Sequence, residues 1–315
     1  MNYRNKLSRK PERHHYFPQF FLRNFAIDDQ KKKVMALHKL GSRAEWAKKS
    51  IESIAFEYDL YVHMDGSTPI SVEEKINADF ETPISQTDTW KKISTGGITD
   101  LDASDRAVLY SLVRNFEVRT PHYRNTLSEL SLLAGRPDSG MKFSDEEKAM
   151  YAELRADPRL MSECVNKLAF STEWTARDFS SCSISVWRVC YPVYVCTTPV
   201  HVFPISDHPA LRASQAGVVA HSYLMPLTPN AYVSLTLGDF DGEFSNEKVS
   251  AEVEIFLKRH IVSQFSYWPT IRHMICNDIG LVDNVKFAGY NCTMDSFDQK
   301  RFLCVTIRFV HTTSL

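Results

Sequence analysis

The segment "HHYFPQFFLRNF", residues 14 to 25, places polar side chains capable of chemistry among closely spaced aromatic residues. Proline often occupies the first position of a helix, so Pro18 predicts a helix start. Gln19 and Arg23 are then four residues apart on one helical face, and His15 lies just before the same row. An arginine fork binds phosphate or carboxylate, and an imidazole serves as ligand, acid or base. The alternative is a structural helix with a capping histidine and a surface arginine.

Two carboxylates recur in "VEEKINADFE", a segment with a helical pattern. Glu74 and Glu81 are seven residues apart, which is two turns of an α-helix, so they are expected to share a face. Such a pair holds a hard cation, or divides acid and base roles, when another segment faces it. The alternative is a charged face in contact with water. Pro83, a few residues further on, predicts a kink or division of the helix.

A third candidate, "EVRTPHYR", lies where Pro121 should kink a long helix. A kink exposes backbone groups and lets a side chain leave the regular helix surface. Arg119, His122 and Arg124 are therefore candidates to bind an anion. The alternative is that these three side chains cover the break.

The fourth candidate is "VFPISDHPA", in which an apolar strand ends at Ser206, Asp207 and His208 before Pro209. Catalytic carboxylates are common at such strand ends, because the sheet fixes the side chain while the loop leaves it accessible. An Asx-type turn, with Asp207 bonded to nearby backbone, is the alternative.

Composition limits the classes of protein that these residues can serve. The chain has 315 residues, 43% of them apolar, which fits a globular protein with a substantial core. Lys and Arg total 37 against 38 for Asp and Glu, which argues against a protein that coats polyanions. The sequence contains no GxxxxGK[ST], GxGxxG, GxSxG or HExxH motif, so P-loop, dinucleotide, serine-elbow and zincin chemistry lose support.

The seven cysteines form no CxxC pair and most lie in apolar surroundings, so buried reduced thiols are expected. No window approaches the length of a membrane span, and the opening motif is too short and polar for a signal peptide. We therefore expect a cytoplasmic protein that does not enter the membrane.

The elements that must position these residues change type along the chain. Apolar stripes with helical spacing dominate residues 72–156, whereas β-branched and aromatic runs dominate from Ser183 onwards. Helices first and strands later predict an α+β fold, with a helical N-terminal half packed on a mostly antiparallel sheet from the C-terminal half. We expect a single compact domain over residues 1–315, with a subdivision into a mainly helical part, 1–140, and a part with helix and sheet, 141–315.

Four features in this order, "HHYFPQFFLRNFA", the paired glutamates, "VRTPHYR" and "ISDHPA", resemble the bacterial and phage-associated family known as domain of unknown function 4238. A tyrosine after a short strand, here in "EYDLY", also fits the family pattern. The resemblance runs from residue 14 to about residue 270, and His208 stands where the family more often has asparagine. It implies no reaction, but it groups the motif residues His14, His15, Arg23, Glu74, Glu81, Arg119 and Asp207.

Buried charge is costly unless it is paired, so this inventory is unusual for a purely structural framework. The leading hypothesis is a metal-assisted phosphodiesterase or nuclease, acting as an effector of bacterial defence or competition. The expected ligands of one or two divalent cations, Mg²⁺ or Mn²⁺, are Glu74, Glu81, Asp207 and one histidine, His15 or His14. The other histidine is expected to act as general acid or base, while Arg23 and Arg119 stabilise phosphate charge. The further polar candidates near this site are Gln19, Asn24, His122 and His208.

Two other hypotheses remain open from the sequence. In the first, the chain is a binding module for a nucleotide, a nucleic acid or a protein, whose arginines and histidines bind an anion. In the second, the polar network is buried and only fixes the fold. Paired arginines and a closed site would favour these alternatives, whereas carboxylates open to a cleft would favour an enzyme.

Overall fold

The structure is a computed structural model. It describes residues 12–40, 43–65, 68–97, 100–140, 142–157, 160, 163, 182–188, 194–195, 198–199, 203–214, 221–237, 246–248, 251–268 and 270–277. The helices in this part of the chain are α1 (Gln19–Leu22), α2 (Glu73–Ile76), α3 (Thr82–Gln86), α4 (Asp88–Thr95), α5 (Ala103–Val118), α6 (Pro121–Ala134), α7 (Asp145–Ala156) and α10 (Ala251–Tyr267).

The longest strands belong to two sheets, and the other strands are short. They are β1 (Arg13–His15), β2 (Lys33–Leu40), β3 (Arg43–Ser50), β4 (Phe56–Tyr58), β5 (Val62–Asp65), β6 (Thr68–Ser71), β7 (Cys182–Arg188), β8 (Tyr194–Val195), β9 (Thr198–Pro199), β10 (Ile205–Ser206), β11 (Leu211–Ser214), β12 (His221–Thr228), β13 (Ala231–Leu237), β14 (Asn246–Lys248) and β15 (His273–Ile275).

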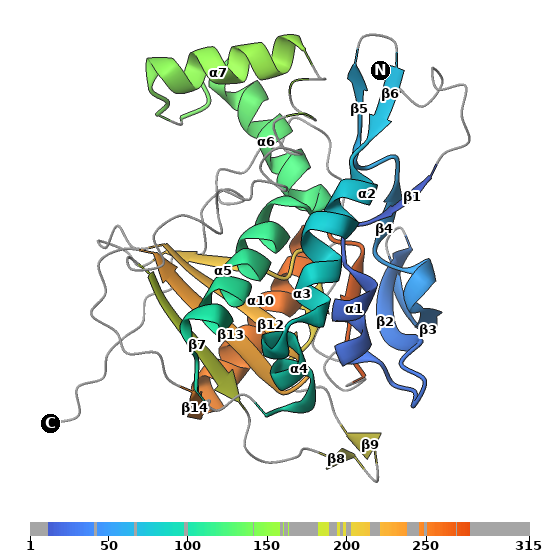
Figure 1. The fold of residues 1–315 in the computed structure, drawn as a ribbon. Coiled ribbons are helices and arrows are strands. Elements are labelled where there is room, and N and C mark those ends of the chain that lie inside the picture. The colour runs from blue at the N-terminus through green and yellow to red at the C-terminus, as the bar shows by residue number, and fades with distance from the viewer. Residues whose placement is uncertain are drawn as a thin grey trace, which may run out of the picture.

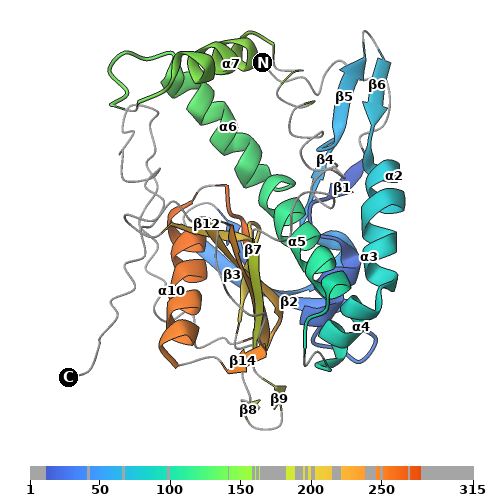
Figure 2. The same ribbon diagram turned by 60° about the vertical axis from the view of Figure 1, so that its left-hand side comes forward.

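The larger sheet has five strands in the order β11-β12-β13-β7-β14. Its pairs are antiparallel except for β14, which runs parallel to β7. Helix α10 covers one face, while α4 and α5 cover the other (Figures 1 and 2). Helices of the N-terminal half thus pack on a mostly antiparallel sheet from the C-terminal half, which confirms the predicted α+β fold.

The smaller sheet, in the order β10-β15-β2-β3, joins the two ends of the described chain. Strand β2 pairs with β3 on one side and with β15 on the other. N-terminal strands therefore share one sheet with strands that lie more than 150 residues later. This sheet holds the opening motif against the C-terminal half.

The long helical region divides at the predicted proline. Asp102 caps α5 in a capping box with Asp105. Helix α5 ends at Val118, and Thr120 caps α6, whose first residue is Pro121. Because proline lacks an N–H, it suits the first turn of a new helix and not the interior of the old one.

Cys182 and Cys276 are buried, as expected, and the other five cysteines lie outside the described residues. Among the helices that are described, none combines the length and the apolar character that crossing a membrane requires.

Candidate functional site

The opening motif separates into an anchor and an exposed row. Phe17, Phe21, Leu22 and Phe25 are fully buried, and Phe17 and Phe21 pack against Phe116 of α5. Helix α1 starts directly after Pro18, as predicted, and continues as a 3-10 turn over Arg23–Phe25. The aromatic residues therefore fix the backbone, and the polar residues between them face the other way.

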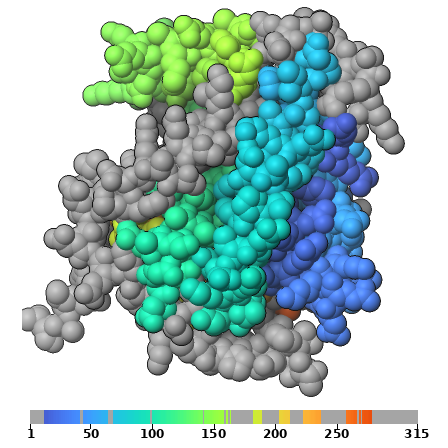
Figure 3. All heavy atoms as spheres, viewed as in Figure 1, coloured from blue at the N-terminus to red at the C-terminus, as the bar shows by residue number. Residues whose placement is uncertain are grey.

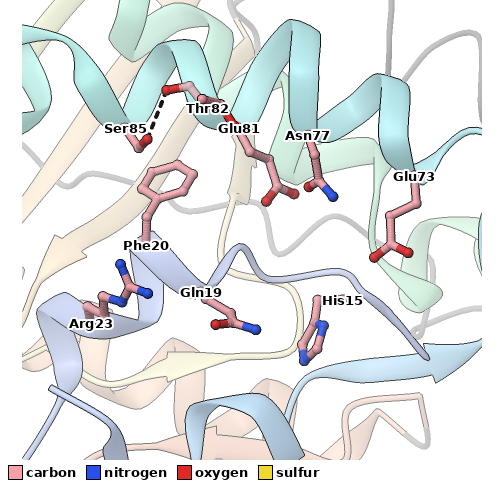
Figure 4. Close-up of a pocket in the computed structure, with 9 residues that line it drawn as sticks. All are labelled: His15, Gln19, Phe20, Arg23, Glu73, Asn77, Glu81, Thr82 and Ser85. Atoms are coloured by element: carbon pink, nitrogen blue, oxygen red, sulfur yellow. Dashed lines mark hydrogen bonds between the residues drawn. The ribbon is translucent and has the colours of Figure 1, made fainter.

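These polar residues line a cavity of about 280 Å³ between α1 and the helical segment 73–86. His15, Gln19 and Arg23 form one wall, and they recur at every fourth position. In the space-filling view the blue N-terminal segment and the cyan helical segment lie side by side (Figure 3). The opposite wall is a second row with the same spacing, Glu73, Asn77, Glu81 and Ser85 (Figure 4).

The second row contains Glu73 where Glu74 was predicted. Glu74 is exposed and does not line the cavity, so its expected pairing with Glu81 on one face is wrong. The reason is a π-helical turn over Asn77–Glu81, between α2 and α3. In a regular α-helix, residues seven positions apart share a face. A π turn adds one residue, so residues eight positions apart, here Glu73 and Glu81, share a face instead.

The π turn has a local cause in the sequence. A proline at position 83 cannot donate to the carbonyl four residues earlier, and its ring clashes with that carbonyl. Widening the preceding turn relieves this clash while the helix continues into α3. The irregularity expected at Pro83 is thus a π turn within a continuous helix, and this turn changes which glutamate faces the cavity.

His15 lies at one end of the first row. Its Nε2 is 3.3 Å from the carbonyl oxygen of Glu52. Because a carbonyl only accepts, Nε2 must carry the proton, and Nδ1 of the neutral ring is left as an acceptor. Burial lowers the pKa of His15, although the Glu52 carbonyl and Glu81 oppose this effect. The neutral, proton-accepting imidazole is therefore favoured.

Glu73 lies across the cavity from His15 (Figure 4). Burial raises the pKa of Glu73, and the backbone N–H of His15 opposes that rise. Its Oε2 is 3.5 Å from Nε2 of His14. His14 is fully buried and accepts the backbone N–H of Tyr61 at Nδ1, so it supports Glu73 from behind and does not line the cavity.

Arg119 reaches the second row from inside the protein. Its guanidinium is 1% exposed and contacts Glu81 at 2.6 Å from Nη2 to Oε1. It also donates to the Tyr61 hydroxyl, the Asn115 side chain and the carbonyl of His15. Burial disfavours the charged guanidinium, but Tyr61 and Glu81 outweigh burial and raise its pKa. Arg119 is thus a buried brace for Glu81 and for the backbone of the first row.

Arg23 has the opposite environment. It is exposed, and no side chain among the described residues pairs with it. It lies at the opposite end of the cavity from Glu73, with Gln19 between them (Figure 4). Asn24 points elsewhere, since its Nδ2 donates to the carbonyl of Leu227 at 3.1 Å. The cavity thus has a cationic end at Arg23 and an acid–base end at His15 and Glu73.

Asp207 does not line this cavity, and the expectation that it lies in the same cleft is wrong. It is 2% exposed and accepts from the Tyr16 hydroxyl at 2.8 Å, the His273 ring, and the backbone N–H groups of Arg272 and His273. Burial would raise the pKa of Asp207, but His273 and Tyr16 lower it overall. It ties the residue after His15 to strand β15.

His122 and His208 form a separate cluster at the break between α5 and α6. Their ring centroids are 4.7 Å apart, and His122 stacks on Trp268 at 4.2 Å. His208 bonds to the Thr120 hydroxyl, so the cap of α6 contacts the "SDHP" turn. Burial lowers the pKa of both rings, that of His122 to about 4. This cluster covers the break. Arg124 is half-buried near Tyr61 and Glu57, and burial lowers its pKa to about 10.

The expected cation ligands are therefore not assembled as a set. Among the described residues, no group of three or more His, Cys, Asp or Glu side chains converges in a way that would hold a metal ion. Glu81 and His15 line the cavity, whereas Glu74 and Asp207 lie elsewhere.

Several cavity residues were missed from the sequence. Glu73, Asn77 and Ser85 recur with Glu81 at every fourth position. The buried Ile76 and Ile84 are eight residues apart, which is two such periods. This four-residue period, longer than the 3.6 of an α-helix, was the signal that could have identified them.

A family model described as "Protein of unknown function (DUF4238)" matches residues 13–264. The matched range includes every residue that lines the cavity. No curated protein and no solved structure matches the chain.

Proposed function

The chain belongs to the DUF4238 family, whose description assigns no reaction, and from this premise we propose that it hydrolyses phosphodiester bonds in nucleic acid or nucleotides. The observation that carries the proposal is that the two ends of the cavity carry different chemical groups. Arg23 lies at one end without a partner among the described residues, and the pair His15 and Glu73 lies at the other (Figure 4). Cytoplasmic action as an effector of bacterial defence or competition is part of the same proposal.

Arg23 and Gln19 suit a phosphate group. A guanidinium presents a fork of N–H donors that matches two phosphate oxygens, and an amide adds one further donor. The charge of Glu81 does not oppose such binding strongly, because Arg119 lies 2.6 Å behind it. The phosphate would therefore lie at the Arg23 end of the cavity, with its ester bonds directed towards His15.

His15 and Glu73 suit the two proton transfers of hydrolysis. Nδ1 of His15 would take a proton from the water that attacks phosphorus, and Glu73 would give a proton to the leaving oxygen. Acid and base pairs of this kind are recognised by environments that shift the pKa values of the two groups in opposite directions. Here burial lowers the pKa of His15 and raises that of Glu73.

The proposal includes a divalent cation that is held by fewer protein ligands than the sequence suggested. Mg²⁺ usually keeps several waters and binds through one or two carboxylates plus the phosphate oxygens of the substrate. Glu81 is already held by Arg119, so a hydrated Mg²⁺ or Mn²⁺ would contact Glu73 in its ionised form. An ionised Glu73 has no proton to donate, so this role is an alternative to its role as general acid. The cation would add Lewis-acid stabilisation to the charge of the phosphate.

The experiment incubates wild type with a generic phosphodiester, DNA, RNA and nucleotides, with Mg²⁺, Mn²⁺ or chelator. The His15→Ala variant is expected to lose about 10²- to 10⁴-fold in rate, and Arg23→Ala about 10²- to 10³-fold. Glu74→Ala is the matched control on the same helical segment, and its rate should equal that of wild type. Absence of turnover under every condition, or equal turnover in the His15 variant, would contradict the proposed reaction.

A binding module is the second candidate, favoured by one observation. Glu81 is neutralised by Arg119, so the cavity has a single carboxylate, Glu73, without an arginine partner among the described residues. Such a site binds an anion without needing to transform it. Phosphate binding that Arg23→Ala abolishes, in a protein that cleaves none of the substrates, would favour this candidate over the hydrolase.

A further inference from the structure

A second cavity, of about 660 Å³, adjoins the first, and Arg23 lines both. Its walls come from four elements that are far apart in the sequence: the segment 23–31, the end of α4, the end of β7, and the turn between β12 and β13. The second cavity has the size of a small-molecule site, whereas the first, at about 280 Å³, is at the lower limit of that range. A phosphate group at Arg23 would therefore continue into the second cavity with its larger substituent.

The walls of the second cavity combine apolar surface with amides. Ile93 and Ala231 are buried and provide the apolar part. Asn24 donates to the carbonyl of Leu227 through Nδ2, and no described residue donates to its Oδ1. Asn230 lies exposed on the β12–β13 turn. Apolar surface with a few amide groups is the combination that binds a planar nucleobase and reads its edge.

The floor of the second cavity is the end of α4. The helix stops at Gly96, whose φ of 75° places it in the left-handed region, and Arg188 donates to the Gly96 carbonyl. Ser94 and Thr95 line the cavity from the last turn of the helix, and the Thr95 hydroxyl donates to the carbonyl of Lys91, so its oxygen remains available only as an acceptor. Hydroxyl groups at this position suit the hydroxyls of a sugar.

The charge of the second cavity also suits a nucleotide. Arg23, Lys31 and Arg188 line it together with two carboxylates, Asp28 and Asp29. The Oδ1 of Asp28 already accepts the backbone N–H groups of Lys32 and Lys33. Three basic side chains against two carboxylates leave the walls with a net positive charge, which favours an anionic ligand.

We infer that the second cavity binds the nucleoside next to the phosphate held by Arg23, so the substrate is a nucleotide unit that spans both cavities. The inference rests on the proposed function, because it takes the phosphate position from it. It adds the recognised group: a nucleobase against Ile93 and Ala231, read by Asn24 and Asn230, with its sugar towards Ser94 and Thr95. A simple phosphodiester without a nucleoside fills only the smaller cavity.

The experiment measures binding of a nucleoside monophosphate and of inorganic phosphate by calorimetry, which requires no turnover. Wild type is expected to bind the nucleoside monophosphate at least about tenfold more tightly than phosphate. Asn230→Ala should reduce that ratio about fivefold, through loss of one contact to the base. Thr95→Trp, which fills the second cavity from an exposed position, should remove the preference. Neither variant should change the affinity for phosphate. Glu74→Ala should leave the affinities for both ligands unchanged.

The outcomes separate this inference from the proposed function. Phosphate binding that depends on Arg23, without preference for the nucleoside monophosphate, would overturn the inference and leave the phosphate site intact. A preference that persists in both Asn230→Ala and Thr95→Trp would also overturn it. Absence of binding of either ligand by wild type would overturn the phosphate site itself, and the inference with it.

Discussion

Two arginines of the site, Arg119 and Arg23, have the same chemistry and opposite environments. Arg119 is 1% exposed, and its guanidinium contacts a carboxylate, a hydroxyl, an amide and a carbonyl. Arg23 is exposed at the junction of two cavities, and no side chain among the described residues pairs with it. One side chain is fully occupied by the protein, whereas the other has its donors free for a ligand.

The charged residues of the motifs divide in the same way, into those buried within the protein and those that line the cavity. Asp207 and His14 resemble Arg119, because each is buried and bonded to backbone or side chains on more than one element. His15 and Glu73 resemble Arg23, because they line the cavity. Buried members are expected to determine stability, and cavity members to determine binding and turnover.

The largest expected effect contrasts the two arginines directly. Arg119→Ala should lower the free energy of unfolding by about 3–5 kcal/mol, because it leaves Glu81 without its partner in a largely buried network. Arg23→Ala should change it by about 0.5 kcal/mol or less, because an exposed side chain without a partner is lost. Urea denaturation of both variants measures the two values. Equal losses would show that the two environments do not differ as described.

The histidines permit a second contrast, through the pH dependence of stability. Burial lowers the pKa of His122 to about 4 in the folded protein, from an ordinary value of 6.5. Between these values the unfolded chain binds more protons, so protonation favours unfolding. The contribution of His122 is complete above pH 6.5 and decreases as the pH falls to about 4, by roughly 3 kcal/mol in total.

Denaturation of wild type and of His122→Phe across this pH range measures the effect. The phenylalanine keeps a ring beside Trp268 and cannot titrate, so the variant should lose less stability on acidification than wild type. Burial also lowers the pKa values of the buried His208 and the half-buried His260, so part of the pH dependence should persist in the variant. Parallel curves for the two proteins would contradict the assignment to His122.

Much of the framework followed from local sequence rules. The helix start after Pro18, the cap at Asp102, the break at Pro121 and the strand at β2 each depend on neighbouring residues alone. The row of His15, Gln19 and Arg23 followed from spacing in the same way. What local rules did not give is the partner of each charge: nothing near Arg119 in the sequence indicates Glu81, 38 residues away, or His15, 104 residues away.

The prediction that Glu74 and Glu81 share a helical face was wrong for a different reason. The spacing of Glu74 and Glu81 predicts a shared face only if every turn has 3.6 residues. The π turn over Asn77–Glu81 violates that condition, and the shift of one residue exchanges Glu74 for Glu73. Asp207 was misplaced because a strand end predicts accessibility, while the contacts that bury it come from Tyr16 and from β15, at opposite ends of the described chain.

The smallest expected effect tests that exchange of adjacent glutamates. Glu73→Gln removes a negative charge from the cavity, so inorganic phosphate should bind about three- to fivefold more tightly near neutral pH, an effect below about 1 kcal/mol. Glu74→Gln removes the same charge from the exposed side of the segment, and its effect on affinity should stay within about twofold, because water screens it. Calorimetry with phosphate compares the two variants under identical conditions. A regular α-helix would reverse the result, because Glu74 would then share a face with Glu81 and Glu73 would turn away. A larger gain in Glu74→Gln would therefore contradict the π turn, and with it the identity of the carboxylate that faces His15.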